Sequence, residues 1–485
     1  MMGRKMNDWT IAAFSDMLDY EQPNKYIVDS TEYSDLYKTP VLTAGKSFIK
    51  GYTNEKNNIF DKVPVIIFDD FTTASQWVNF NFKVKSSAMK ILHPTCSLVN
   101  MKFMYYCMQV NKVRSDTHKR YWISIFAPKE FNLPSLPEQR AIVAKIEELF
   151  SSLDNGIENL EKAKEQLKVY RQAVLKKAFE GELTKEWREM QTDLPSSVEL
   201  LQQIKREREN YYNQQIAEWE TKVKEWEQYG KEGKKPGKPK AIKQLHNPSE
   251  EEIESLSSLP SIWVYNYLAY AGKLARGKSK HRPRNDKRLF DGKYPFIQTG
   301  EVKAVDRITS FSKTYNEFGL SQSELWPCGT LCITIAANIA ETAFLDIEAC
   351  FPDSIVGYHP FTAVVDKQYV NYFFHSAKAR LSAYAPATAQ KNINLNTLEN
   401  LLFPFCSVKE QNQIVLEIES RLSVCDKVEE SISEGLLKAN ALKQSILKKA
   451  IDGALLSEVE LESCRQETDW EPAAVLLERI KSEKK

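Results

Sequence analysis

The stretch Glu138-Gln139-Arg140-Ala141-Ile142-Val143-Ala144-Lys145-Ile146-Glu147 recurs as Glu410-Gln411-Asn412-Gln413-Ile414-Val415-Leu416-Glu417-Ile418-Glu419, at a constant offset of 272 residues. The same offset, without a gap, carries Leu175-Lys176-Lys177-Ala178 onto Leu447-Lys448-Lys449-Ala450 and Gly181 onto Gly453. A match held over so long a stretch indicates an internal duplication. We therefore expect the same long element in each half of the chain.

Shorter echoes lie on either side of this repeat. Downstream, Leu200-Leu201 and Ile204-Lys205 recur as Leu476-Leu477 and Ile480-Lys481. The upstream matches are Trp9 with Trp263, Lys38-Thr39-Pro40 and Gly45 with Lys293-Tyr294-Pro295 and Gly300, and His93-Pro94 with His359-Pro360. We therefore expect the chain to consist of a globular part, a helical part, a second globular part and a second helical part, in that order.

The repeated stretch has the apolar spacing of a long helix with one seam. In the first copy the seam positions are Ile146, Leu149, Leu153, Leu160, Ala163, Leu167, Tyr170 and Val174, with Gly156 as a gap. The second copy keeps Ile418, Val428, Ile432, Leu442 and Ile446, with Arg421 and Cys425 as interruptions. Gly181 and Gly453 are typical helix stops. Two such helices on one chain favour pairing with each other over a core helix or an intermolecular coiled coil.

The globular halves carry short β-like runs broken by Gly, Asn and Asp, and each is expected to be a mixed α/β domain. The predicted fold class is α+β: two mixed α/β domains separated by two long antiparallel helices, with an internal repeat. The predicted boundaries are a first domain at 1–132, a long helix at 133–183, a helical connector with a Lys/Gly/Pro-rich linker at 184–260, a second domain at 261–404, a second long helix at 405–456 and a helical tail at 457–485.

Composition excludes several classes of protein. The 485 residues carry a net charge of +1 with 42% hydrophobic and 27% charged residues, the balance of a globular protein. No apolar run is long enough to span a membrane, and residues 1–7 lack the apolar core of a signal peptide, so we expect a cytoplasmic protein. The eight cysteines form no CxxC pair, and we expect no zinc site.

Local clusters of basic and polar residues predict contact with nucleic acid. Between Val264 and Pro295, nine Lys and Arg face only Asp286 and Asp291, in a Gly- and Pro-containing loop suited to phosphate contact. The alternative is a solvated surface loop. Hydroxyl and amide groups elsewhere are suited to base edges. The predicted DNA-binding residues are Lys46, Lys50, Thr72, Thr73, Ser75, Lys85 and Ser86 in the first domain, and Arg276, Lys278, Lys280, Arg282, Arg284, Thr299, Asn338, Gln390 and Lys391 in the second.

Two motifs are rejected as signs of catalysis. Residues 272–279 satisfy GxxxxGK[ST], and residues 65–70 resemble the acidic strand that accompanies such a phosphate loop. A phosphate loop opens directly into a helix, whereas Lys280-His281-Arg282-Pro283-Arg284 resists helix formation. No adenine or cytosine methyltransferase motif is present as such. We therefore expect no catalytic residues and no cofactor on this chain, and an ATPase stays as a minor alternative.

Residues 196–230 are helical in pattern but polar, with Tyr211, Tyr212, Trp219 and Trp226 among the charges. This pattern fits a packing or partner-binding helix and equally a solvated helix. Residues 231–240, rich in Lys, Gly and Pro, are expected to be a flexible linker.

The chain resembles the specificity subunits of type I restriction-modification systems. The resemblance rests on the two Glu-Gln helices that end in Leu-Lys-Lys-Ala near a glycine, on Gln390-Lys391-Asn392-Ile393-Asn394 before the second helix, and on the Lys38 and Lys293 segments. The first half departs from the second at Arg120-Tyr121-Trp122-Ile123-Ser124, where DNA contacts would be built differently.

The resemblance implies a subunit without catalysis of its own, whose globular halves are two target-recognition domains held apart by the antiparallel helices in a pseudo-twofold repeat. Because the two domains differ in sequence, we expect them to read an asymmetric bipartite target in double-stranded DNA. The implied partners are two modification (methyltransferase) subunits and motor-nuclease restriction subunits, on which S-adenosylmethionine, ATP and Mg²⁺ would be bound. The alternatives are the specificity subunit of a related non-type-I or methylation-only system, and a coiled-coil scaffold that binds protein alone.

Overall fold

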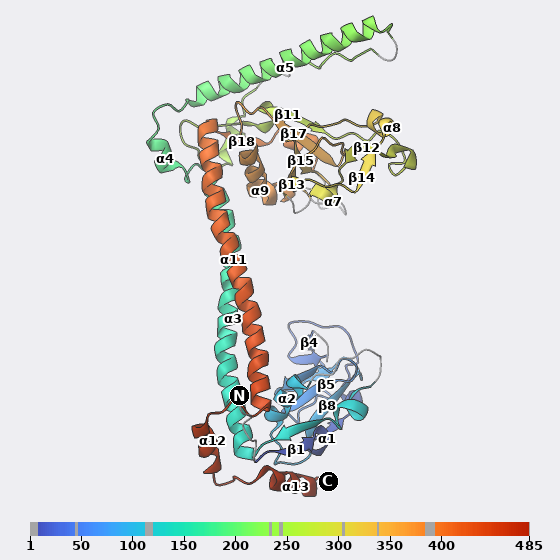
Figure 1. The fold of residues 1–485 in the computed structure, drawn as a ribbon, viewed down its shortest axis with the longest axis vertical. Helices are drawn as coiled ribbons and strands as arrows, with labels where there is room; N and C mark the ends of the chain where they lie inside the picture. The colour runs from blue at the N-terminus through green and yellow to red at the C-terminus, as the bar shows by residue number, and fades with distance from the viewer. Residues whose placement is uncertain are drawn as a thin grey trace. The chain divides into compact units, whose positions relative to one another are not determined.

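A computed structural model describes residues 8–43, 47–111, 120–231, 235–241, 246–302, 306–336, 339–383 and 393–484 (Figure 1). The chain divides into two compact units. Unit 1 consists of residues 1–163 and 431–485, and unit 2 consists of residues 164–430. Each unit is an α+β structure, in agreement with the predicted fold class, and each is described by itself below.

The repeated stretch forms the two long helices α3 (Leu136–Phe179) and α11 (Val408–Ile451). Serines at matching positions begin them: the Ser135 hydroxyl bonds to the Glu138 carboxylate at 3.1 Å, and the Glu410 amide donates to the Ser407 hydroxyl at 3.1 Å. Both are N-terminal caps of the usual kind. The following glutamine is also used in the same way twice, because Gln139 donates to the Pro134 carbonyl and Gln411 to the Cys406 carbonyl.

Both helices end at the predicted glycines. Gly181 and Gly453 have φ of +76° and +68°, the left-handed conformation that favours glycine. The amide after each glycine donates back into the last turn, from Glu182 to the Lys177 carbonyl at 2.9 Å and from Ala454 to the Lys449 carbonyl at 2.7 Å. The duplication therefore preserves the start, the length and the stop of the helix.

The two helices run antiparallel, side by side (Figure 1). In unit 1 Asp154 of α3 forms an ion pair with Lys443 of α11, and in unit 2 Arg171 pairs with Asp426 at 2.7 Å. Residue numbers thus rise along α3 as they fall along α11. The predicted intramolecular pairing is confirmed.

One part of the predicted seam is wrong. Cys425, expected to interrupt the seam of α11, is 1% exposed, whereas Val428 and Leu442 are 41% and 49% exposed. The buried positions Ile418, Cys425, Ile432 and Ile446 are separated by sevens or multiples of seven. A small thiol behaves as an apolar side chain in such a seam, so Cys425 continues the buried row, whereas Val428 and Leu442 lie outside it.

Unit 1 is built on an antiparallel sheet of four strands in the order β2-β8-β5-β6. The strands are β2 (Leu18–Glu21), β5 (Val65–Asp69), β6 (Ser75–Val78) and β8 (Met89–Pro94). A smaller sheet holds β3 (Thr39–Leu42), β4 (Ile49–Thr53) and β7 (Lys83–Val84), and β1 (Thr10–Ala13) pairs with β9 (Glu130–Leu133). Helix α2 (Met101–Val110) packs beside β6, and the short helix α1 (Phe14–Met17) follows β1.

Unit 2 repeats this arrangement. Its main sheet has the order β11-β17-β15-β16 with β13 added at the edge, and β10 pairs with β18 as β1 pairs with β9. The strands are β10 (Val264–Tyr267), β11 (Gly272–Arg276), β13 (Arg307–Ile308), β15 (Leu331–Thr334), β16 (Thr342–Leu345), β17 (Ile355–Pro360) and β18 (Leu402–Phe405). A separate hairpin joins β12 (Phe290–Phe296) to β14 (Lys313–Tyr315), and the helices are α7 (Thr299–Val302), α8 (Glu317–Ser321), α9 (Lys367–Ala383) and α10 (Leu395–Glu399).

The faint upstream echo has a structural basis in these sheets. Pro94 pairs with Leu18 in β2, and Pro360 pairs with Gly272 in β11, so the two His-Pro matches occupy the same place in corresponding strands. The four-strand order is the same in both units. The duplication therefore includes the globular halves as well as the helices.

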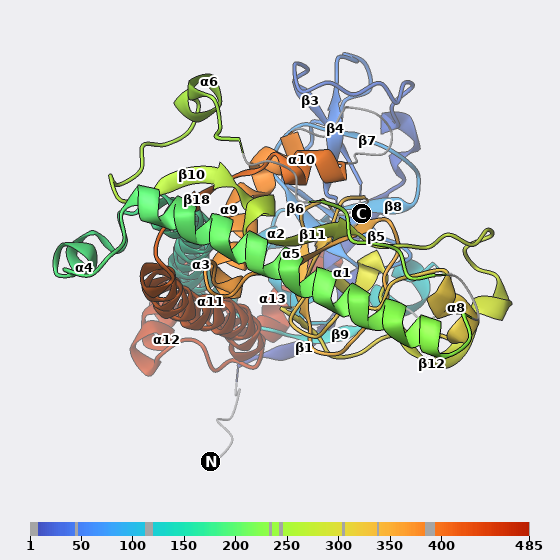
Figure 2. The ribbon, with the colours of Figure 1, turned by 90° about the horizontal axis from the view of Figure 1, so that it is seen from above.

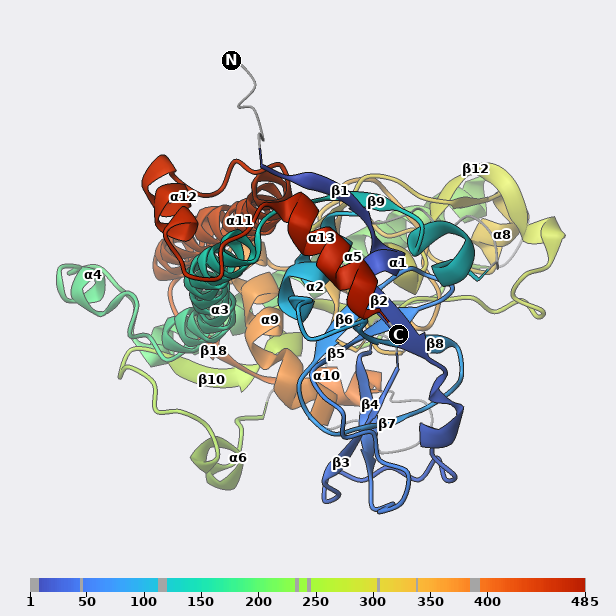
Figure 3. The same cartoon turned by 90° about the horizontal axis from the view of Figure 1, so that it is seen from below.

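The segment after each long helix returns to a globular core. In unit 1, α12 (Glu458–Arg465) is followed by α13 (Ala473–Glu483), whose Leu476, Leu477 and Ile480 lie in the same core as Phe14. Figure 3 shows α13 beside β1. In unit 2, α4 (Lys185–Glu189) leads to α5 (Ser197–Gln228), whose Ile204 lies in the unit 2 core. The downstream match between residues 200–205 and 476–481 thus corresponds to a packing contact that occurs in both units.

Helix α5 continues well past this contact and crosses the β11 end of unit 2 (Figure 2). The described residues 235–241 return along it: the indole of Trp219 donates to the Pro236 carbonyl at 3.0 Å, and Lys238 and Lys235 lie over the rings of Trp219 and Trp226. Tyr211 packs on Phe361 at 4.9 Å between ring centroids. These contacts favour the packing alternative for this helix over the solvated one.

Candidate nucleic-acid interface

In unit 1 the predicted DNA-binding residues lie on three loops and strands. Lys50 is exposed on β4, and Lys85 and Ser86 are exposed after β7. Thr72 is exposed in the turn between β5 and β6. Lys46 lies outside the described residues.

Two residues of the same turn are buried. Thr73, with φ of +59°, is 5% exposed, and Ser75 is 8% exposed. The Ser75 hydroxyl accepts a hydrogen bond from Gln109 of α2 at 2.9 Å. Their side chains therefore support the turn, and of the three predicted residues Thr72, Thr73 and Ser75, Thr72 is the one that is exposed.

The acidic pair at the end of β5 also supports this turn. Asp69 accepts hydrogen bonds from the amides of Phe71 and Thr72, and Asp70 accepts one from the amide of Trp122 at 2.8 Å. Asp70 is 4% exposed and lies 3.6 Å from the ammonium of Lys90. The geometry gives both carboxylates a structural role.

In each unit, one backbone hydrogen bond joins the residue that follows strand β5 or β15 to a segment much later in the chain. In unit 1 the amide of Tyr121 donates to the Asp70 carbonyl at 2.9 Å, and in unit 2 the amide of Ile393 donates to the Ile335 carbonyl at 3.0 Å. These two bonds place Tyr121 of unit 1 and Ile393 of unit 2 at corresponding positions. Residues 122–126 form a π-helix, with Ile123 62% exposed. Gln390 and Lys391, and also Asn338, lie outside the described residues.

In unit 2 the basic residues follow one another along β11 and the extended segment after it. Arg276 ends β11, and Lys278, Lys280, Arg282 and Arg284 are exposed in the segment that follows. The GxxxxGK[ST] pattern thus lies along a strand and an extended segment, and no helix follows it before residue 287. The backbone differs from that of a nucleotide phosphate loop.

The basic segment is accompanied by acidic residues that lie far from it in the sequence. Glu324 bonds to Lys273 at 2.8 Å and also to Lys278. Asp353 accepts from Arg284 at 2.7 Å, and its carbonyl accepts from Arg276. The net charge of this surface is therefore lower than the sequence of residues 264–295 indicates.

A cavity of about 380 Å³ brings Arg284 and Thr299 together. Its other polar lining residues include Asn285, Gln298 and Lys313, and the Lys313 ammonium lies 5.3 Å from the ring centre of Phe290. Cationic, amide and hydroxyl groups beside an aromatic ring suit contact with a nucleotide. Gln298 and Lys313 were missed from the sequence, since Lys313 reaches the site only through the pairing of β12 with β14.

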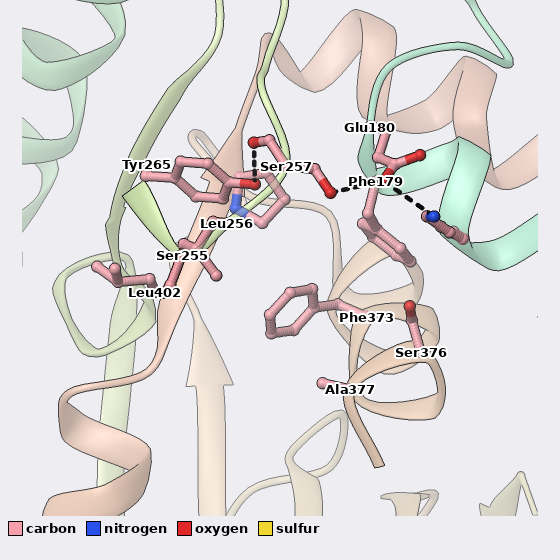
Figure 4. A pocket seen from close by; sticks show the side chains of 12 residues that line it. Phe179, Glu180, Ser255, Leu256, Ser257, Tyr265, Phe373, Ser376, Ala377 and Leu402 are labelled. Carbon is pink, nitrogen blue, oxygen red and sulfur yellow. Dashed lines mark hydrogen bonds and ion pairs between the residues drawn. The ribbon is translucent and has the colours of Figure 1, made fainter. Parts of the chain in front are cut away.

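A second cavity, of about 230 Å³, lies at the end of α3 (Figure 4). Phe179 and Phe373 provide its apolar wall, and the Ser257 hydroxyl donates to Glu180 at 2.5 Å. Tyr265 donates to the Ser257 carbonyl. Because the Ser257 hydroxyl is already bonded to a carboxylate, we read this cavity as a packing feature of the connector.

The described residues also lack two kinds of feature. They contain no helix with the length and hydropathy of a membrane span. Within the same part of the chain, no group of three or more His, Cys, Asp or Glu is arranged to hold a metal ion.

Comparison with known proteins agrees with this picture. Residues 272–437 match the family model of the type I restriction modification DNA specificity domain. The Escherichia coli type I restriction enzyme EcoR124I/EcoR124II specificity subunit is 28% identical over 440 residues, covering 88% of each chain. The EcoBI specificity subunit of Escherichia coli is 24% identical over 356 residues, which cover 73% of this chain and 64% of that one.

A solved structure has the same fold. It comes from work on complex assembly and conformational transition of the type I R-M system, and it aligns with a TM-score of 0.59 at 14% identity, covering 92% of this chain and 98% of that chain. Over most of its length the chain is similar to the specificity subunits of type I restriction-modification systems, and this similarity supports a DNA-recognition subunit of such a system.

Proposed function

We propose that this subunit reads an asymmetric, bipartite target in double-stranded DNA, one half-site with each globular half, and has no catalytic activity itself. The observation that carries the proposal is that two units share one strand order but differ on the surface. Unit 2 has the basic segment after β11, whereas unit 1 has the π-helix at residues 122–126, of which residues 123–125 are exposed. Two different readers on one chain favour two different half-sites.

The proposed contacts are the exposed members of the predicted set. In unit 1 these are Lys50, Thr72, Lys85 and Ser86, and in unit 2 they are Arg276, Lys278, Lys280, Arg282, Arg284 and the partly exposed Thr299. The lysines and arginines are suited to phosphates, and Thr72 and Thr299 to base edges or sugars.

The proposed partners are two modification (methyltransferase) subunits and the motor-nuclease restriction subunits. S-adenosylmethionine, ATP and Mg²⁺ would be bound by those subunits. Exposed apolar side chains on the long helices, such as Val169, Leu416 and Val424, at 59% to 70% exposure, support a protein partner on these helices.

The test is to co-express the chain with the methyltransferase encoded beside it and to map adenine methylation over the host genome. We expect one interrupted, asymmetric motif that is lost when this chain is omitted. A soluble complex that leaves the DNA unmethylated would overturn the proposal and favour a protein-binding scaffold. Methylation without restriction of unmodified DNA would identify a methylation-only system.

A further inference from the structure

The cations of the basic segment are held by a neighbouring acidic loop. The loop at residues 322–324 runs along residues 278–280: the amide of Lys280 donates to the Gln322 carbonyl at 3.1 Å, and the Ser323 hydroxyl donates to the Lys278 carbonyl at 2.7 Å. Glu324 then bonds through one carboxylate oxygen to Lys273 and through the other to Lys278. Backbone and side chain together fix this acid beside the cations.

Glu324 is well placed to stay ionised. Although burial alone raises the pKa of this carboxyl, hydrogen bonds from Lys273 and Lys278 bring its pKa below the ordinary value. Its side chain is only 24% exposed, and the Lys273 ammonium also lies 4.3 Å from the ring centre of Trp326. The negative charge therefore persists at neutral pH among the proposed phosphate-contacting groups.

Asp353, which precedes β17, contacts other cations of the same segment. Its carbonyl accepts from Arg276 at the start of the segment, and its carboxylate accepts from Arg284 at 2.7 Å. Arg282 approaches the same carboxylate to 4.0 Å. Two acids from distant parts of unit 2 thus occupy the cations at both ends of the segment.

These ion pairs add little to the stability of the fold. The side chains of Lys278, Arg282 and Arg284 are 50%, 56% and 52% exposed, and ion pairs so exposed contribute little to folding. Their effect on DNA binding is larger. A phosphate that binds one of these cations must first displace the carboxylate from it, and the phosphate then lies near that negative charge. Non-specific binding depends almost wholly on phosphate contacts, whereas a specific complex also gains base contacts.

We propose that Glu324 and Asp353 are specificity-determining residues, which weaken binding to non-target DNA more than binding to the target. The inference rests on the proposed reading of DNA by unit 2. The acids work as a repulsive element that a correct sequence overcomes through its base contacts and an incorrect sequence does not.

The test compares E324Q and D353N with the wild type in the assembled methyltransferase complex. D346N is the matched control, because Asp346 pairs with Arg307 at 2.7 Å on β13, outside the basic segment. Affinity is measured over a range of salt concentrations for a duplex with the mapped target and for a duplex of equal length without it.

We expect E324Q to tighten non-target binding by about 3- to 10-fold, to steepen its dependence on salt by about one phosphate contact, and to change target binding much less. D353N should act in the same direction, while D346N should leave the ratio of the two affinities unchanged. An E324Q ratio equal to that of D346N, or equal tightening on both duplexes, would overturn the inference. A wild-type complex without preference for the target would instead overturn the proposed function.

Discussion

Glu410, in the first turn of α11, uses both oxygens of a fully buried carboxylate. One oxygen accepts from the Thr184 hydroxyl at 2.8 Å and from the Arg188 guanidinium at 2.7 Å, and the other accepts from the indole of Trp263 at 2.9 Å. Three segments of unit 2 therefore meet at one side chain: the turn after α3, the strand region at β10 and the start of α11. The residue joins the repeated helix to its globular half.

The isosteric change E410Q tests this junction. A glutamine side chain has one acceptor and one donor, so its NH₂ group would face either Arg188 and Thr184 or Trp263, all of which are donors. We expect the free energy of unfolding to fall by about 2–4 kcal/mol, the cost of a buried donor left without a partner beside an uncompensated buried cation. Urea denaturation of the purified subunit measures the change.

The control is E417Q, on the same helix, because Glu417 is 35% exposed and pairs with Arg421 one turn away at 3.2 Å. Pairs of this kind contribute a few tenths of a kcal/mol. Equal destabilisation by E410Q and E417Q would show that the buried network is not the source of the effect.

For single residues, the sequence predicted where functional side chains lie along the chain better than it predicted which partners they contact. The Glu-Gln pair was identified as the start of each helix, but its buried partners Arg188 and Trp263 are too distant in sequence to be assigned without the fold. Likewise, the basic stretch was expected to be a loop that resists helix formation, whereas its first residues form strand β11. Its neutralisation by Glu324 and Asp353 was missed because strands β15 and β17 bring those acids back to β11.

Among the elements, α3 and α11 show how closely a repeated sequence repeats its structure. Each begins at a serine cap and ends two residues before a glycine in the left-handed conformation. The sequence predicted the two glycine stops, because a helix stop is a local signal, but it did not predict the serine caps. Part of the α11 seam was misplaced, because Cys425 was expected to interrupt it. The thiol is in fact buried, and whether a thiol is buried depends on the contact with the partner helix.

Two glycines within these helices give a matched pair for measurement. A Cβ added at Gly156 would meet nothing within 4 Å, whereas one added at Gly435 would lie 3.2 Å from a methyl group of Leu160. Alanine in place of a helical glycine stabilises by about 1 kcal/mol where the site is open. We expect G156A to gain about that amount and G435A to gain clearly less, because Leu160 must move.

Thermal and urea unfolding of the two variants measure this difference. Both glycines belong to unit 1, so a single unfolding transition reports on both. A G435A variant as stable as G156A would contradict the packing of α11 against Leu160.

For the whole molecule, the main feature is that unit 1 is assembled from both ends of the chain. Leu476, which is fully buried, and Ile480 of α13 share a core with Phe14, which follows β1. Arg140 at the start of α3 pairs with Asp469 at 2.8 Å and with Glu467 at 2.5 Å. Unit 2, in contrast, is one continuous stretch, residues 164–430.

Removal of residues 457–485 should therefore damage the distant N-terminal half. Each large apolar side chain lost from the core costs on the order of 2–3 kcal/mol, and α13 supplies three of them. We expect limited proteolysis of the truncated chain to cut unit 1 within residues 8–135 while residues 246–407 stay resistant. Cleavage of both units at equal rates, or of neither, would contradict the assignment of α13 to the unit 1 core.

The interrupted course of unit 1 also determines the order in which the protein can fold as it leaves the ribosome. Domains fold as their chain emerges, yet the first globular half lacks the helix α13 that closes its core until residues 473–483 have been synthesised. Unit 2 has all of its residues by position 430 and can complete its core first. The half that is synthesised first is thus the half that matures last, and until then its open core is the part of the nascent chain most exposed to aggregation and to chaperones.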